Sequence, residues 1–134
     1  MRNMMITTFL LMMLGVTAGA SDAPKVPRFI QETFPQHAVG PAFDTFKEIM
    51  LHPDSALDAG TRELIALAVS AQVPCDYCVY YHQKAARAHG ADESAIKEAL
   101  AVAALVRKWS TILNGSGYDA QQWRAEVNAM FSGE

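Results

Sequence analysis

The sequence predicts an all-α protein, and three observations support this fold class. Apolar residues recur at every third or fourth position in several segments, and no segment alternates apolar and polar residues over a sustained length. Proline, glycine or asparagine separates the periodic segments. With 134 residues, of which 51% are hydrophobic, the chain suits one domain with one core. We therefore expect about five to six helices around a common core.

The first twenty residues differ from the rest and predict a secretory signal peptide, residues 1–20. Arg2 precedes an apolar stretch, residues 4–16, and the small residues Ala18-Gly19-Ala20 follow it. This order predicts cleavage after Ala20. An uncleaved anchor is the alternative, but the apolar stretch is shorter than the about 20 residues that a membrane helix needs. We expect an exported, periplasmic protein without a stable membrane anchor.

Residues 21–42 contain four prolines and predict an N-terminal arm with at most a short helical turn near residues 29–34. The helical domain then covers residues 43–134. Its first helix is expected to end at His52, because the residue before Pro53 is disfavoured in the helical region. The apolar residues expected on one face of this helix are Phe43, Phe46, Ile49 and Met50.

Four further helices follow from local capping and breaking signals. Asp58 is a candidate N-cap of a helix through Gln72, with the apolar positions Leu64, Leu67, Ala68 and Ala71. Pro74 is expected to open the next helix, which ends at Gly90. Asp92 caps a long helix, residues 96–113, closed by the glycine-rich residues 114–117, and Asp119 begins the last helix.

The candidate chemistry lies in residues 63–82. On a helix of about 3.6 residues per turn, Cys75, Cys78 and His82 fall within roughly 60° of one another. In a first helical turn, the unpaired N–H groups and the helix dipole lower the pKa of a thiol such as Cys75. His82 lies one turn from Cys78 and can exchange a proton with it. The pattern predicts a redox-active dithiol with a base.

Glu63 lies in an apolar run on the preceding helix. If this carboxylate faces the cysteine helix, it could share a proton relay with His82. The alternative is a solvated acid near a helix N-terminus, which is the commoner position of glutamate.

The residues Glu63, Cys75, Cys78 and His82, at these spacings, resemble the motif of the AhpD-like alkylhydroperoxidases in the carboxymuconolactone decarboxylase family. The resemblance covers roughly residues 43–115. It implies an all-helical subunit, assembly into homo-trimers or hexamers, and a thiol peroxidase that uses a hydroperoxide, an external dithiol reductant and no cofactor. It also implies that Cys78 attacks and Cys75 resolves, whereas the helix-dipole argument favours attack by Cys75.

One departure from the family pattern concerns Tyr77, which stands where the better-known peroxidases carry a further histidine. This weakens the expectation of peroxidase activity and leaves the dithiol intact. The family's lactone decarboxylases generally lack the cysteine pair, so its presence argues against that reaction.

Four other interpretations of the cysteines stay open. A structural disulfide would contribute only about 2 kcal/mol over so short a loop. A zinc site with Glu63 or His89 as fourth ligand lacks the second pair of ligands that structural zinc usually has. Thiol–disulfide exchange with other proteins, or a non-catalytic binding or assembly module, would also suit an exported chain. The acidic balance, 11 Lys and Arg against 14 Asp and Glu, does not favour a nucleic-acid partner.

Overall fold

The computed structural model describes residues 25–133. The predicted signal peptide, with its cleavage position, lies outside these residues. The described chain contains six α-helices and two short helical turns and no strand, which confirms the all-α prediction. The elements are α1 (Arg28–Thr33), η1 (Gln36–Ala38), α2 (Val39–Phe46), η2 (Lys47–Leu51), α3 (Ala59–Gln72), α4 (Asp76–Ala88), α5 (Glu93–Ser116) and α6 (Ala120–Phe131).

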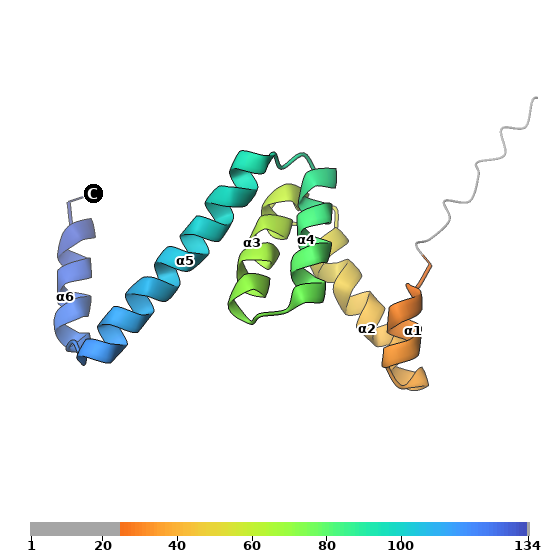
Figure 1. Ribbon diagram of the computed structural model, residues 1–134, viewed down its shortest axis with the longest axis horizontal. Helices are drawn as coiled ribbons and strands as arrows, with labels where there is room; N and C mark the ends of the chain where they lie inside the picture. Colours follow the sequence, from red (N-terminus) through yellow and green to blue (C-terminus); the bar gives the residue numbers. More distant parts are fainter. Residues whose placement is uncertain (1–24, 134) are drawn as a thin grey trace, which may run out of the picture.

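The helices α3 and α4 lie side by side at the centre of the molecule (Figure 1). On one side α2 leads away to α1, and on the other the long helix α5 packs beside α3 and continues beyond it to α6 (Figure 1). Within the described chain, no helix is both long enough and apolar enough to cross a membrane. The central pair α3–α4 thus has the segment α2–η2 on one side and α5 on the other.

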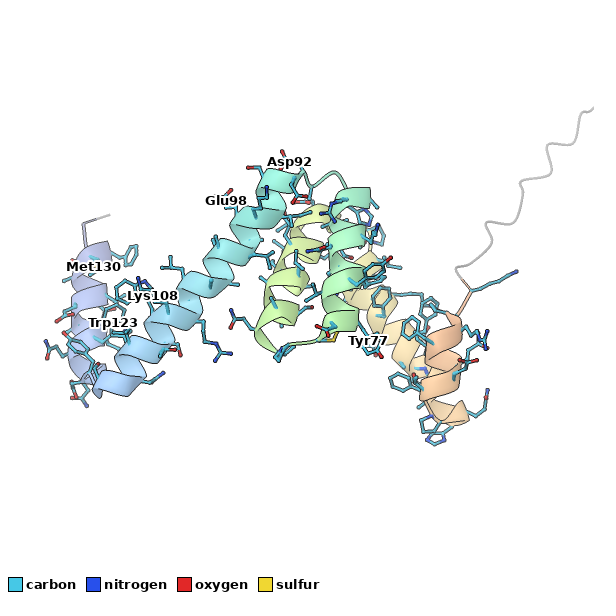
Figure 2. All side chains as sticks on the ribbon, viewed as in Figure 1. Tyr77, Asp92, Glu98, Lys108, Trp123 and Met130 are labelled. Atoms are coloured by element: carbon cyan, nitrogen blue, oxygen red, sulfur yellow. A yellow bond between two sulfur atoms is a disulfide. The ribbon has the colours of Figure 1, made fainter. Side chains whose placement is uncertain are left out.

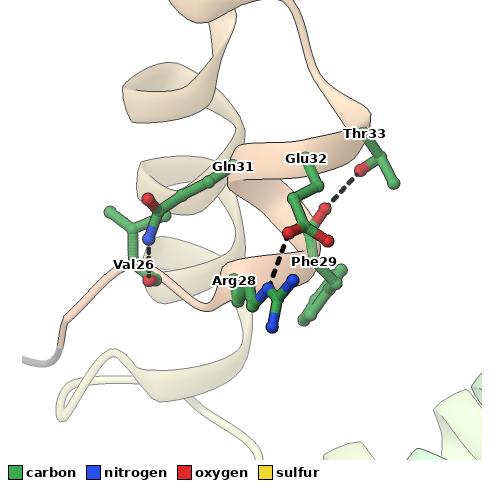
Figure 3. Close-up of polar contacts among 6 residues, drawn as sticks. All are labelled: Val26, Arg28, Phe29, Gln31, Glu32 and Thr33. Atoms are coloured by element: carbon green, nitrogen blue, oxygen red, sulfur yellow. Dashed lines mark hydrogen bonds and ion pairs between the residues drawn. The ribbon is translucent and has the colours of Figure 1, made fainter.

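The N-terminal segment is more helical than the sequence predicts. The expected short helix is present as α1, and α2 begins at Val39, four residues before the expected start at Phe43. Ile30 of α1 packs with Val39 and Phe43 in a small buried cluster. Figure 3 shows the polar contacts of α1, including the hydrogen bond from Gln31 Nε2 to the carbonyl oxygen of Val26 at 2.7 Å. This packing stabilises helical structure in residues 28–42, where the prolines predicted an irregular arm.

The helix over residues 43–52 ends where Pro53 predicts, at His52, but its last turn differs from the prediction. Residues 47–51 form a π-helical turn, which has one more residue per hydrogen-bonded ring than an α-helix. A wider turn changes the angular spacing of the residues within it, so the face predicted from α-helical spacing does not hold there. Phe43 is buried as expected, whereas Ile49 is 62% exposed.

The buried face of α3 also differs from the predicted one. Leu67 is fully buried as expected, but its neighbours on the buried face are Gly60, Glu63 and Ser70. Ala71 of the predicted apolar face is exposed. Polar groups can occupy a buried face when they are hydrogen-bonded, and Ser70 Oγ donates to the carbonyl oxygen of Ala66 at 2.6 Å. Glu63 has its own partner, described below.

The predicted N-caps are confirmed. The side chains of Asp58, Asp92 and Asp119 accept hydrogen bonds from backbone N–H groups in the first turns of α3, α5 and α6. The long helix α5 continues to Ser116, three residues beyond the predicted end at residue 113, and its C-cap Gly117 has a φ of 65°, the left-handed conformation that glycine adopts most readily.

Candidate active site

The buried carboxylate of Glu63 contacts the imidazole of His82. Glu63 Oε2 lies 2.6 Å from His82 Nδ1, and the two side chains are 2% and 17% exposed. Because Glu63 is buried, the alternative of a solvated surface acid is wrong. The pair joins α3 to α4, and at this distance it is a charge-assisted hydrogen bond whenever the carboxylate is ionised.

The two cysteines are joined by a disulfide bond, with their Cα atoms 5.3 Å apart. In Figure 2 the bond lies at the N-terminal end of α4, near the labelled Tyr77. The sulfurs therefore share one side of α4. His82 follows Cys78 by four residues on the same helix, so their side chains are neighbours on one face.

The prediction that Pro74 opens α4 is wrong. The helix begins at Asp76, and Cys75 is its N-cap, with φ of −105° and ψ of 95°. The N–H of Cys75 donates to the carbonyl oxygen of Ser70, at 3.0 Å. The turn after α3 is therefore hydrogen-bonded to the end of α3, and α4 starts only after it. Cys75 still lies at the positive end of the helix dipole. The N–H of Cys78 donates to Cys75 Sγ at 3.3 Å, so sulfur takes the place of the usual capping oxygen.

The aromatic ring of Tyr81 lies beside His82, and the ring of Phe46 lies beside Tyr81. The ring of Tyr81 meets the His82 ring edge to face at a centroid distance of 5.0 Å, and the ring of Phe46 meets Tyr81 at 6.1 Å. Burial raises the pKa of the Tyr81 phenol above its ordinary value, and the charge of Glu63 raises it further. The sequence gives no local signal that places Phe46 here, because it lies on another helix more than 30 residues away along the chain.

The structure places the four residues that the sequence singled out in two contacting pairs: Cys75 with Cys78 in the disulfide, and Glu63 with His82 in the hydrogen bond. In residues 25–133 no group of three or more His, Cys, Asp or Glu side chains is arranged to hold a metal ion. Both cysteines and His82 are partly exposed, whereas Glu63 is buried. An all-helical chain that carries a partly exposed Cys-x-x-Cys disulfide and, one helical turn further along α4, a histidine bonded to a buried glutamate defines the class of a helical thiol protein.

The comparisons place the chain within a family. The model of the carboxymuconolactone decarboxylase family matches residues 38–118, more than half of the chain. The protein belongs to this family. A solved structure, the alkylhydroperoxidase AhpD core from Rhodospirillum rubrum, is similar with a TM-score of 0.60 and 30% sequence identity, over 63% of this chain and 62% of that one.

Two curated relatives are similar over shorter stretches, and both are uncharacterized. One is protein 4 in the cox locus of Paracoccus denitrificans, 46% identical over 54 residues, which cover 40% of this chain and 49% of that protein. The other, from Cupriavidus necator, is 41% identical over 49 residues, which cover 37% of this chain and 43% of that protein. The chain thus matches about half the length of these relatives.

Proposed function

We propose that this protein is a thiol-dependent oxidoreductase that reduces hydroperoxides with its Cys75–Cys78 pair. The observation that carries the proposal is the hydrogen bond between the buried Glu63 and the partly buried His82, which lies one helical turn from Cys78. A disulfide that only stabilised the fold would have no need of an acid–base pair whose histidine lies one helical turn away. The similarity to an alkylhydroperoxidase core supports the choice of hydroperoxides as substrate.

The proposed cycle begins with the reduced dithiol. The Cys78 thiolate attacks the terminal oxygen of the hydroperoxide, the O–O bond breaks, and the alcohol leaves with a proton delivered from His82. Cys78 is then a sulfenic acid. Cys75 loses its thiol proton and attacks this sulfur, the S–O bond breaks, the departing hydroxide takes up a proton and leaves as water, and the disulfide closes. An external dithiol reopens the disulfide by exchange and is itself oxidised, so the cycle needs no bound cofactor.

The assignment of Cys78 as the attacking residue rests on its position one turn from His82. The N-cap position of Cys75 suits the other role. The N–H of Cys78 points at Cys75 Sγ and can stabilise a thiolate there, both when Cys75 attacks the sulfenic acid and when an external thiol displaces it.

Thiol–disulfide exchange with a protein substrate is the second candidate. Tyr77, between the two cysteines, is 91% exposed, so this end of α4 offers an open surface to a macromolecule. Such a role would use the same dithiol and suits the predicted export to the periplasm. The third possibility is a non-catalytic module whose disulfide stays permanently oxidised, which the reduction potential distinguishes from both active roles.

We also propose that the chain forms a homo-oligomer. Five large apolar side chains of α5 are each at least half exposed: Val102, Leu105, Val106, Trp109 and Ile112. A soluble protein rarely leaves so many apolar side chains of one helix in water, and a second copy of the chain would cover them.

The decisive test is turnover by single-cysteine variants. In an assay with an alkyl hydroperoxide and a dithiol reductant, Cys75→Ser and Cys78→Ser should each abolish turnover. Titration of the wild-type thiols should show two lost per equivalent of hydroperoxide, whereas Cys75→Ser should stop at a sulfenic acid on Cys78. Turnover in both variants at the wild-type rate would rule out the dithiol mechanism. Reaction with protein disulfides but not with hydroperoxides would favour the second candidate.

A further inference from the structure

The last residue of α3, three positions before Cys75, is tied to α5 by three hydrogen bonds. Gln72 Nε2 donates to the carbonyl oxygen of Ala103 at 2.9 Å, and Arg107 Nε donates to Gln72 Oε1 at 2.8 Å. Arg107 Nη2 donates to the main-chain oxygen of Gln72 at 3.3 Å. We call these contacts the Gln72–Arg107 clamp. They satisfy both ends of the glutamine amide and place a cation at the C-terminus of α3, where the helix dipole favours it.

The clamp is connected to Cys75 through a short turn. Only Val73 and Pro74 separate Gln72 from Cys75, and proline restricts the backbone of this turn. The N–H of Val73 donates to Val69 and that of Cys75 to Ser70, both at 3.0 Å, so the turn is folded back onto the last turns of α3. Whatever holds the end of α3 therefore also holds the backbone of Cys75.

We propose that Gln72 and Arg107 are positioning residues that keep Cys75 at the N-cap of α4 when the disulfide is reduced. In the oxidised chain the bond to Cys78 holds Cys75 in place. After reduction that restraint is lost, and the hydrogen bond from the Cys78 N–H to Cys75 Sγ persists only if the turn stays where it is. The helix N-terminus then stabilises the Cys75 thiolate.

This inference rests on the proposed function, in which the Cys75–Cys78 pair cycles between dithiol and disulfide. The clamp then influences the reduction potential of the pair. A stabilised reduced form makes a disulfide more oxidising. Loss of the clamp should therefore favour the disulfide over the dithiol.

The test measures the thiol–disulfide equilibrium of the full chain in glutathione buffers, with dithiothreitol buffers for a more reducing pair. In Arg107→Met and in Gln72→Leu, the equilibrium constant for disulfide formation should rise roughly threefold to tenfold, the size expected of one hydrogen bond. The double variant should add little, because the two residues act through the same contacts. Arg107→Lys, which keeps the charge and one donor, should recover part of the wild-type value.

Arg87→Met is the matched control. It removes the pair between Arg87 Nη2 and Glu93 Oε2, 2.9 Å apart, which ties α4 to α5 at the end far from the cysteines. Its equilibrium should equal that of the wild type. Unchanged equilibria in both clamp variants, with lowered melting temperatures, would make the clamp purely structural and overturn the inference, as would an equal shift in Arg87→Met. If the wild-type pair is reduced only by strong dithiols, the proposed function is contradicted instead. The equilibria of the wild type and the clamp variants in dithiothreitol buffers would still decide the role of the clamp.

Discussion

Replacing Glu63 by glutamine should slow the oxidation of the dithiol with little effect on the fold. The substitution keeps the shape of the side chain and its capacity to hydrogen-bond with His82 Nδ1, 2.6 Å away, but removes the charge. It therefore separates the electrostatic part of the contact from its packing.

The magnitude follows from the burial of the pair. A hydrogen bond to a charged group contributes about 1.5–3 kcal/mol and one between neutral groups about 0.5–1.5 kcal/mol. Since Glu63 is only 2% exposed, little solvent screening reduces this difference. The midpoints of these two ranges differ by about 1.3 kcal/mol. An activation barrier higher by this amount would slow oxidation about tenfold. If the carboxylate also accepts a proton during the reaction, the loss should approach about 100-fold.

The assay mixes the reduced protein with an alkyl hydroperoxide and counts the remaining thiols over time. Glu48→Gln is a matched control, because Glu48 Oε2 lies 3.8 Å from His52 Nε2 in an exposed pair of the same residue types. We expect the wild-type rate for this control. A Glu63→Gln variant that oxidises as fast as the wild type, with an unchanged melting temperature, would refute the role of the buried acid.

Three further predictions concern pH, packing and assembly. Since the folded pKa of Tyr81 is raised above its ordinary 10.0, its contribution to stability is complete below that pH and is lost as pH rises through the folded pKa. Between pH 9 and 11, roughly one unit either side of the unfolded pKa, the free energy of unfolding of Tyr81→Phe should thus fall less than that of the wild type. Urea titrations measure both, and equal losses would contradict this prediction. Leu67→Ala, at 0% exposure, should cost about 2–5 kcal/mol in the free energy of unfolding, against under about 0.5 kcal/mol for Leu57→Ala, at 47% exposure; similar costs would contradict the packing argument. Light scattering should give a multiple of the single-chain mass, and Val106→Glu should lower it; a wild-type monomer would exclude the oligomer.

The helices that begin with an aspartate could be predicted because their signals are local. A carboxylate that caps a first turn needs only the three residues after it, so Asp58, Asp92 and Asp119 mark their helices without any knowledge of the fold. The start of α4 could not be found in this way. It depends on the hydrogen bond from the N–H of Cys75 back to Ser70, which competes with the usual preference for proline in a first helical turn.

The four site residues could be named from their spacing, but the contact between Glu63 and His82 could not. The spacing places His82 beside Cys78 because both lie on one helix. The position of Glu63 depends on how α3 is rotated against α4. The apolar pattern favoured a buried face with Leu64 and Ala71, whereas the observed face includes Gly60, Glu63 and Ser70. Tertiary packing decided this rotation.

The helix α3 carries contacts toward the redox pair at two separate points. Near its start, Glu63 bonds to His82 on α4, and at its end Gln72 bonds to α5 while the following turn delivers Cys75. Neither contact has a periodic signature, because each joins single polar residues that lie 19 or more positions apart in the sequence. It follows that changes on α3 should alter the chemistry of the dithiol in two distinguishable ways. A change at Glu63 should alter the rate of oxidation, and a change at Gln72 should alter the equilibrium between thiols and disulfide.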